Sequence, residues 1–198
     1  MADKTKQFPY TWTEVSEEDQ KGKTFTRFSK NSNRQIMIIY FSEFNDLFSE
    51  KSYFRHFIIS KPMDMYITRH YKSMAEKVWN FKTRPSDVFV VTYPKCGTTL
   101  THELTWQIAN GVQVDSDLSK EPIFKRAPWI EFSCIGNPTG LNPEQIENPT
   151  SIKNMDLFMD SVDYTDKFKS PRIIKTHLPM SMLPSDMLDN AKAIYVAR

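Results

Sequence analysis

The chain has 198 residues, enough for one sizeable hydrophobic core but not for a second full domain. Its 26 Lys and Arg residues against 24 Asp and Glu residues give a formal net charge of only +2. No global charge therefore argues for a nucleic-acid partner, and a bound anion would have to be held by a local site. The start carries no apolar segment typical of a secretory signal, and the apolar run at residues 36–41 is too short to span a bilayer. The two cysteines, Cys96 and Cys134, show no metal-binding spacing and suit a reducing compartment, so we expect a cytoplasmic protein without a membrane partner.

The first part of the chain gives the weakest pattern. Within residues 1–60, the alternation at residues 34–54 fits strands or a packed arm, and we treat this segment as an N-terminal arm. From Asp64 onward, apolar residues recur at helical spacing as far as Val78, with Asp64 as the N-cap and a turn at residues 84–87 as the end. One helix is therefore predicted before the first strand of the main sheet.

A strand, a tight loop and a helix follow in quick succession. Residues 87–93 (DVFVVTY) form a short apolar run, the pattern of a strand covered on both faces in a parallel sheet. After the loop, Leu100, Leu104 and Ile108 lie on one stripe of an amphipathic helix that ends at Asn110. This is half of a βαβ unit.

Two more strands are predicted near the end of the chain. They cover residues 172–177 (RIIKTH) and 191–198 (AKAIYVAR), with a short helix at 185–190 between them. The polar stretch at residues 137–151 is rich in Pro and Asn and is predicted to be a loop. The elements together predict an α/β fold with a parallel sheet.

The loop after the first strand has the features of an anion pocket. At the start of a helix several backbone N–H groups lack partners, and the helix dipole adds partial positive charge. Gly97 lets a ligand approach the backbone, Thr98 and Thr99 add hydroxyl groups, and Lys95 adds a full charge. A phosphate or a phosphosulfate would fit. The alternative is a plain strand-to-helix turn with a capping threonine.

The loop is not a Walker loop. Lys95 comes two residues before the only glycine of the loop, whereas the Walker pattern places Lys directly after Gly and has an earlier glycine in the loop as well. A nucleotide kinase, which would need magnesium-dependent ATP binding, is therefore disfavoured. Cys96 lies at the positive helix start, and we expect it to contribute packing or loop contacts before nucleophilic chemistry.

A second group of polar residues ends the strand at 172–177. Lys175 and His177 are two residues apart, so they share one strand face at the edge where parallel strands line a ligand crevice. A histidine there can accept a proton near neutral pH, although an isolated histidine is more often a core or turn residue. Arg198, at the end of the last strand, could grip a phosphate or be a surface charge. The sequence contains no spacing typical of a zinc site, so we expect no metal.

Four blocks, in this order and spacing, resemble the cytosolic sulfotransferase family. The resemblance covers residues 84–198 and is carried by TYPKCGTT, RAPWIEF, PRIIKTHLP and KAIYVAR. It implies a three-layer α/β/α fold around a central parallel sheet, with a P-loop-like strand–loop–helix site. It also implies an enzyme that transfers a sulfuryl group from PAPS (3′-phosphoadenosine 5′-phosphosulfate) to a small-molecule acceptor such as a phenol, alcohol, steroid or amine.

The resemblance also assigns roles to residues. It implies that His177 is the base that deprotonates the acceptor and that Lys175 assists at the transferring sulfuryl group. It also implies that Lys95 stabilises the leaving phosphate and that Trp129 lines the acceptor pocket, with ordinary core packing as the alternative for Trp129. The implied donor-binding residues are Lys95, Cys96, Gly97, Thr98, Thr99, Leu100 and Arg198.

Two features depart from the family pattern. Leu100 stands where the family most often has a tryptophan that stacks on the adenine, so an aromatic contact of roughly 1–3 kcal/mol is absent at this position. The family also continues beyond the position of Arg198 with further donor-site residues. We therefore expect residues 1–198 to be a single, partial sulfotransferase domain. The alternative function is a catalytically inactive truncated module that binds or dimerises, and a homodimer stays open in either case.

Overall fold

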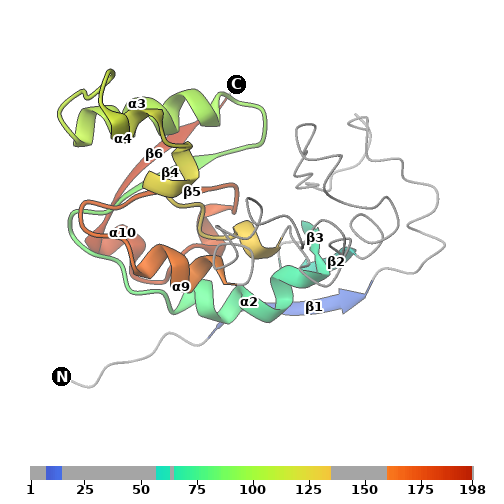
Figure 1. The fold of residues 1–198 in the computed structure, drawn as a ribbon. Coiled ribbons are helices and arrows are strands. Elements are labelled where there is room, and N and C mark those ends of the chain that lie inside the picture. The colour runs from blue at the N-terminus through green and yellow to red at the C-terminus, as the bar shows by residue number, and fades with distance from the viewer. Residues whose placement is uncertain (1–7, 15–56, 63–64, 135–159, 198) are drawn as a thin grey trace, which may run out of the picture.

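The structure, a computed structural model, describes residues 8–14, 57–62, 65–134 and 160–197. Two sheets organise these residues (Figure 1). The first is antiparallel, in the order β1 (Thr11–Glu14), β2 (Phe57–Lys61) and β3 (Met65–Thr68). The second is parallel, with β4 (Val88–Thr92) between β5 (Ile173–Thr176) and β6 (Lys192–Val196).

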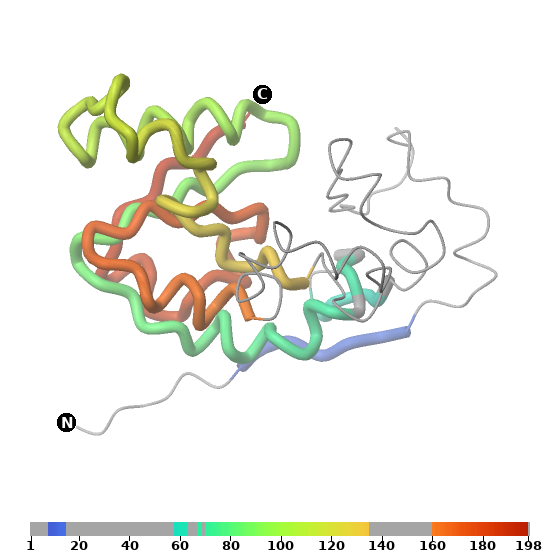
Figure 2. Tube along the Cα trace, in the orientation of Figure 1, coloured from blue at the N-terminus to red at the C-terminus, as the bar shows by residue number. Residues whose placement is uncertain are grey.

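Helices connect and cover the strands, as the path of the chain in Figure 2 shows. The longer ones are α2 (Arg69–Trp79), α3 (Thr98–Ala109) and α9 (Ser161–Asp166). Shorter turns of helix are α4 (Asp117–Lys120), α5 (Ile123–Arg126), η1 (Phe132–Cys134), η3 (Met180–Met182) and α10 (Met187–Asn190). In the part of the chain that the structure describes, none of these helices has the length and apolar character needed to cross a membrane.

The parallel sheet lies between two helical layers, with α3 on one face and α2 and α9 on the other (Figure 1). Phe89, Val91 and Ile174 point to one face and share a buried cluster with apolar residues of α2. The intervening residues Val90 and Ile173 point to the opposite face and pack against Trp106 of α3. Because side chains alternate along a strand, a nearly continuous apolar run serves both faces. The predicted three-layer α/β fold is confirmed.

The helix predicted from Asp64 begins later than expected. Asp64 lies outside the described residues, and α2 starts at Arg69, because residues 65–68 form strand β3. Ile67 is fully buried in that strand and belongs to the same cluster as Tyr71 and Val78 of the helix. The apolar spacing thus continues across the strand–helix junction, since both elements cover one core. The spacing of apolar residues indicates which side chains are buried. Here it did not distinguish the strand conformation of β3 from the helical conformation of α2.

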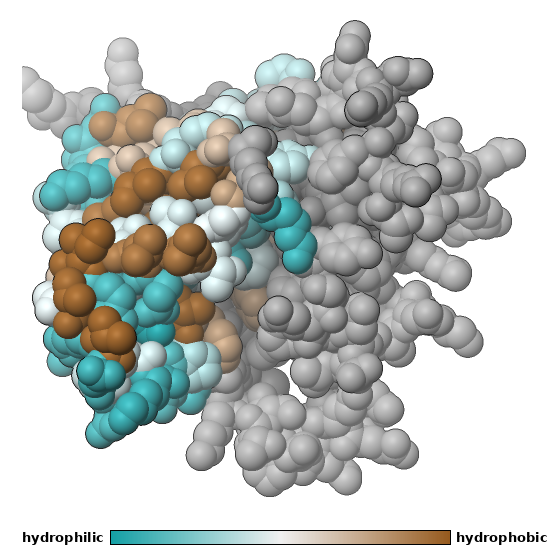
Figure 3. All heavy atoms as spheres, turned by 90° about the horizontal axis from the view of Figure 1, so that it is seen from above, coloured by the Kyte–Doolittle hydropathy of each residue, from teal (hydrophilic) through white to brown (hydrophobic). Residues whose placement is uncertain are grey.

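The apolar stripe of α3 faces outward. Leu100, Leu104 and Ile108 are 64%, 51% and 75% exposed, and Figure 3 shows apolar side chains gathered on the face seen from the α3 side. The buried side of the helix instead carries Thr98, His102, Thr105 and Trp106. The helix and its apolar stripe are confirmed, and the stripe lies on the side away from the sheet. The helix packs its polar start and one tryptophan on the sheet.

The remaining predicted elements divide into two groups. The strands at 87–93, 172–177 and 191–198 are confirmed as β4, β5 and β6, and the short helix at 185–190 is confirmed as α10. Most of the N-terminal arm, the loop at 137–151 and Arg198 lie outside the described residues. The loop between β4 and α3 is described completely, and it is the first part of the candidate site.

Candidate active site at the ends of two parallel strands

The loop between β4 and α3 has an unusual backbone. Lys95 and Gly97 both adopt left-handed conformations, with φ of 67° and 97°. For a residue with a side chain such as Lys95, this costs roughly 1–2 kcal/mol, and strain of this kind clusters at binding and catalytic sites. Gly97 is the N-cap of α3 and provides no capping side chain. The first N–H groups of the helix are therefore left for another partner.

The side chains of the loop divide between the interior and the open side. Lys95, Gly97 and Thr99 are exposed, and a Cβ placed on Gly97 would meet no atom within 4 Å. Thr98 is buried, and its hydroxyl lies 2.5 Å from the hydroxyl of Thr92 at the end of β4. No acidic residue occurs between residues 93 and 100. The loop thus offers open space, backbone donors and a lysine, which together fit an anion.

His177 directly follows β5, and its ring lies beside the end of β4. The ring Nδ1 is 2.9 Å from the carbonyl oxygen of Thr92 and 3.1 Å from the Thr92 hydroxyl. A carbonyl oxygen only accepts, so Nδ1 carries the proton and donates it there, which leaves the lone pair on Nε2. Burial, helped by the nearby charge of Lys175, lowers the pKa of His177 to about 4. The ring is therefore neutral at neutral pH, in the form that can accept a proton.

Lys175 lies on the same face of β5, two residues earlier. Its Nζ is 3.7 Å from the centroid of the Trp129 ring, a cation–π contact. Burial lowers the pKa of Lys175 to about 8, and the carboxylate of Glu131 opposes this shift. The ammonium is thus mostly protonated at pH 7, but it loses its proton at a lower pH than an exposed lysine does.

Trp129 packs between the other members of the site. It is 6% exposed, and its ring meets the ring of His177 edge-on with centroids 5.1 Å apart. Phe132 lies on another side of the indole, with centroids 5.3 Å apart. A parallel bridge joins Trp129 to Lys175, so residues around 129 continue the sheet beyond β5. The indole contacts both site residues of β5 while it is part of the core.

Sequence reasoning missed Thr92 and Glu131. Thr92 contacts both His177 and Thr98, and the only sequence signal for it is its place at the end of a buried strand. Glu131 is fully buried and accepts a hydrogen bond from the backbone N–H of His177 at 2.5 Å. A charged residue inside the apolar block RAPWIEF is the signal that could have found it, because buried carboxylates require partners.

The other candidate residues lie farther from this group. Leu100 points outward from the first turn of α3, and Cys96 is a half-buried free thiol in the loop. His102, a buried core histidine of α3, lies 3.4 Å from the Ile173 carbonyl through Nε2, and burial lowers its pKa to about 4. Over the described ranges, no three His, Cys, Asp or Glu side chains are grouped to hold a metal ion.

The chain belongs to the sulfotransferase family. The family model for the sulfotransferase domain matches residues 85–198, more than half of the chain and the part that contains β4, α3, β5 and β6. The residues of the candidate site, from Thr92 to His177, all lie within this match. The predicted family membership is therefore confirmed.

Individual relatives agree with this result. Sulfotransferase 1A1 of Mus musculus is 37% identical over 133 residues, which is 67% of this chain and 38% of that protein. Cytosolic sulfotransferase 1 of Danio rerio is 33% identical over 132 residues, 65% of this chain and 37% of that protein. The chain thus spans less than two fifths of the length of these relatives.

Solved structures show the same fold. Retinol dehydratase in complex with retinol and PAP is 24% identical, with a TM-score of 0.64 over 95% of this chain and 51% of that chain. Retinol dehydratase with androsterone and the inactive cofactor PAP gives a TM-score of 0.67 over 96% of this chain and 52% of that chain, again at 24% identity. At this level of identity the likeness concerns the fold.

Proposed function

We propose that this chain is a partial domain, residues 1–198, of a cytoplasmic PAPS-dependent sulfotransferase. The reaction is transfer of a sulfuryl group from PAPS to a hydroxyl or amine of a small-molecule acceptor. The observation that carries the proposal is the link from the His177 ring through Thr92 to Thr98, which sets a neutral imidazole beside an anion-binding loop. The proteins named above support the same donor, since retinol dehydratase was solved with PAP.

His177 is the base in this proposal. Its Nδ1 is used by the Thr92 carbonyl, and its Nε2 is the nitrogen that takes the proton from the acceptor hydroxyl or amine. A pKa lowered to about 4 keeps the ring unprotonated at physiological pH. The low value also makes it a weak base in the free chain, so a negative charge arriving with the donor is needed to raise its proton affinity.

The two lysines stabilise charge. PAPS brings an activated sulfuryl group joined to a phosphate, and negative charge grows on that phosphate as the bond breaks. Lys95, on the exposed side of the loop, is placed to offset this charge together with the N–H groups of α3. Lys175, mostly protonated at pH 7, assists at the transferring sulfuryl group. No metal is required in this scheme.

The binding roles follow the same division. Cys96, Gly97, Thr98 and Thr99 provide the loop around the phosphosulfate, with Thr98 acting through its backbone because its hydroxyl is held by Thr92. Leu100 gives an apolar contact beside the adenine, Arg198 contributes to the 3′-phosphate site, and Trp129 forms the wall of the acceptor pocket next to His177. Phenols, steroids, alcohols and amines remain equal candidates for the acceptor.

Two measurements test this function. Calorimetry with PAP on the 198-residue chain should detect binding, and the Thr99→Glu variant, which adds a negative charge at the helix start, should lose it.

In a protein with measurable transfer, His177→Ala should reduce the rate by at least about 10²-fold and leave PAP affinity nearly unchanged, while His70→Ala on α2 serves as the control for removal of a histidine. Undiminished transfer by His177→Ala would remove the base assignment.

A second candidate is a module that binds or dimerises without catalysis. The observation that favours it is the exposed apolar stripe formed by Leu100, Leu104 and Ile108 on α3, because such stripes mark contact surfaces. Sedimentation analysis, which measures the oligomeric state, and calorimetry, which measures PAP binding, together distinguish the two candidate functions. A dimer that binds no PAP favours the module, and a chain that binds PAP favours the sulfotransferase site.

A further inference from the structure

Glu131 occupies a place where a main-chain carbonyl is expected. Residues 128–130 pair with β5 through two parallel-ladder hydrogen bonds, from the Lys175 N–H to the Pro128 carbonyl (2.8 Å) and from the Ile130 N–H to the Lys175 carbonyl (3.2 Å). In a parallel ladder the next bond runs from the N–H of His177 to the carbonyl of Ile130. That N–H is instead bonded to Oε1 of Glu131 at 2.5 Å.

The reason is a change in the direction of the chain. The Ile130 carbonyl accepts the hydroxyl of Ser161 from α9 at 2.7 Å, and the chain turns into η1, where the Phe132 N–H bonds the Trp129 carbonyl. The ladder therefore ends one bond early, and the side chain of Glu131 supplies the missing acceptor. This leaves His177 bonded on both sides, by Glu131 through its backbone and by Thr92 through its ring.

The carboxylate also interacts with a charge. Its negative charge favours the protonated form of the Lys175 ammonium, which lies over the ring of Trp129. Burial raises the pKa of Glu131, and the hydrogen bond from the N–H of His177 opposes that rise. Among the described residues, Glu131 also interacts electrostatically with Tyr71 of α2 and Cys134 of η1, both buried, and burial raises their pKa values as well. Lys175 is thus the positive partner of Glu131 in this set.

We propose that Glu131 is a positioning residue for the proposed reaction: its buried carboxylate fixes the main chain of His177, and its negative charge acts on the ammonium of Lys175, so one side chain influences both residues. This inference rests on the proposed function for the roles of His177 and Lys175. It assigns Glu131 no contact with donor or acceptor, because the residue is fully buried.

The experiment compares two carboxylate-to-amide changes. Glu131→Gln keeps an acceptor oxygen and nearly the same volume but removes the charge, whereas Glu121→Gln makes the same change at the exposed partner of Lys125. NMR of the 198-residue chain measures the amide proton shift of His177 and the pKa of the Lys175 ammonium. We expect Glu131→Gln to lower the pKa of Lys175 and to move the His177 amide signal, and Glu121→Gln to change neither. The proposal is overturned if Glu131→Gln leaves either value unchanged.

A measurement on the parent chain keeps the test open if Glu131→Gln does not fold. The carboxyl carbon of Glu131 is titrated by NMR, and the signals of the His177 amide and the Lys175 side chain are followed in the same series. A common titration step in all three supports the proposal, and independent steps overturn it. These readouts need neither donor nor turnover, so a failure to bind PAP would count against the proposed function and leave this result standing.

Kinetics adds a readout that general loss of structure would not produce. In a protein with measurable transfer, Glu131→Gln should lower kcat by about 10- to 100-fold, because a small displacement of the base is costly, while KM for PAPS changes little. The alkaline limb of the rate profile should also move to lower pH, since Lys175 loses its proton earlier. An unchanged alkaline limb in Glu131→Gln overturns the electrostatic part of the proposal.

Discussion

The two strands that flank β4 have the same pairing and opposite surroundings. β5 and β6 both run parallel to β4 and align with it from Val88 onward. The side chains of β5 are buried, apart from the half-buried Lys175, whereas those of β6 are mostly exposed, including Ile194 at 38% and Tyr195 at 66%. The comparison shows that strand formation and burial are separate outcomes, and the candidate chemistry belongs to the buried strand.

The cover of β5 comes from several segments distant in sequence. Residues 128–130 pair with its outer edge, α3 packs on one face, and the cluster that includes α2 packs on the other. This cover removes water from Lys175 and His177 and lowers the pKa of both. β6 lies at the opposite edge of the described sheet, near α10 (Figure 1).

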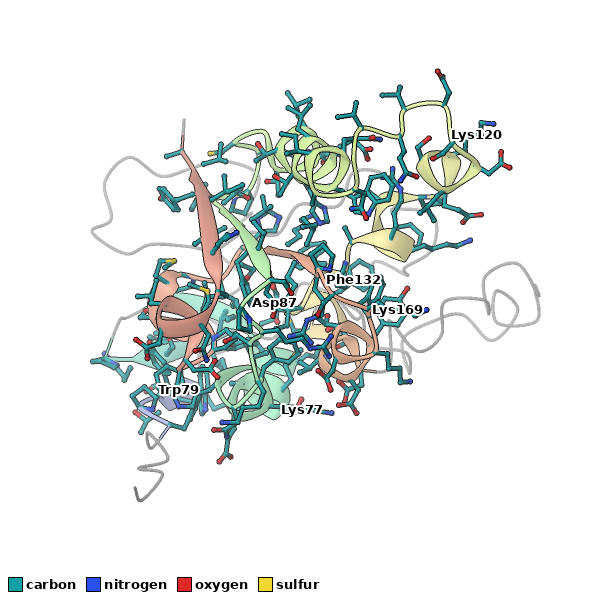
Figure 4. All side chains as sticks on the ribbon, turned by 90° about the vertical axis from the view of Figure 1, so that its left-hand side faces the viewer. Lys77, Trp79, Asp87, Lys120, Phe132 and Lys169 are labelled. Atoms are coloured by element: carbon teal, nitrogen blue, oxygen red, sulfur yellow. The ribbon has the colours of Figure 1, made fainter. Side chains whose placement is uncertain are left out.

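The largest expected difference between the strands concerns their first residues. Arg172 enters β5 with a fully buried side chain that bonds Asp87 through two nitrogens, at 2.9 and 2.6 Å, and Figure 4 shows Asp87 in the interior. Arg172→Leu leaves the Asp87 carboxylate buried without its cation and should lower the free energy of unfolding by about 3–5 kcal/mol. Lys192→Leu, at the exposed start of β6, should change it by less than about 0.5 kcal/mol. Urea denaturation measures both, and equal effects would contradict the contrast.

An apolar pair of positions gives the next largest difference. Ile174 of β5 is fully buried, and Ile194 of β6 is not. Ile174→Ala should cost about 2–5 kcal/mol, because it removes packed methyl groups and leaves a cavity. Ile194→Ala should cost clearly less, since much of its surface already meets water. The same denaturation assay applies, and a larger loss for Ile194→Ala would show that β6 is covered in solution.

Acid should weaken the covered side. The pKa of His102 is lowered to about 4 by burial against β5, while the unfolded value is near 6.5. Between these values the unfolded chain binds a proton that the folded chain does not, so stability is lost as the pH falls from 6.5 toward 4. The contribution of one such histidine is about 3 kcal/mol by pH 4.5. Unfolding curves of the parent and of His102→Gln across this range should diverge in slope, and parallel curves would contradict the assignment.

The site could be predicted where its chemistry is marked in a short stretch of sequence. The loop at 93–97 is indicated by a strand that is followed by Pro-Lys-Cys-Gly and two threonines. Lys175 and His177 are indicated by their two-residue spacing at a strand end. The contact between Thr92 and His177 joins residues 85 positions apart. Such contacts depend on the register between strands, which no local pattern contains.

The fold could also be predicted where it depends on local sequence patterns. The prediction was incomplete where packing between distant elements decides the structure. The parallel strands follow from apolar runs, but the spacing places Ile67 in a helix, because the strand and the helix that follow each other here bury one core. The stripe at Leu100 and Leu104 follows from periodicity alone, which indicates that a helix has an apolar side. Which side meets the sheet was decided by His102, Thr105 and Trp106, whose aromatic and small polar side chains pack closely on β4 and β5.

The smallest expected effect tests that exposed stripe directly. Leu104 is 51% exposed on the outer side of α3, so Leu104→Gln should change the free energy of unfolding of an isolated chain by no more than about 0.5 kcal/mol. Thr105→Leu, on the inner side of the same helix, overpacks a buried position and breaks its hydrogen bond to the Thr101 carbonyl, so it should cost about 1–3 kcal/mol. Denaturation at two protein concentrations, with sedimentation of each variant, measures both changes. A concentration-dependent loss in Leu104→Gln would mean that the stripe is buried between copies in solution, and the contrast between the two sides of α3 would then hold only for the single chain.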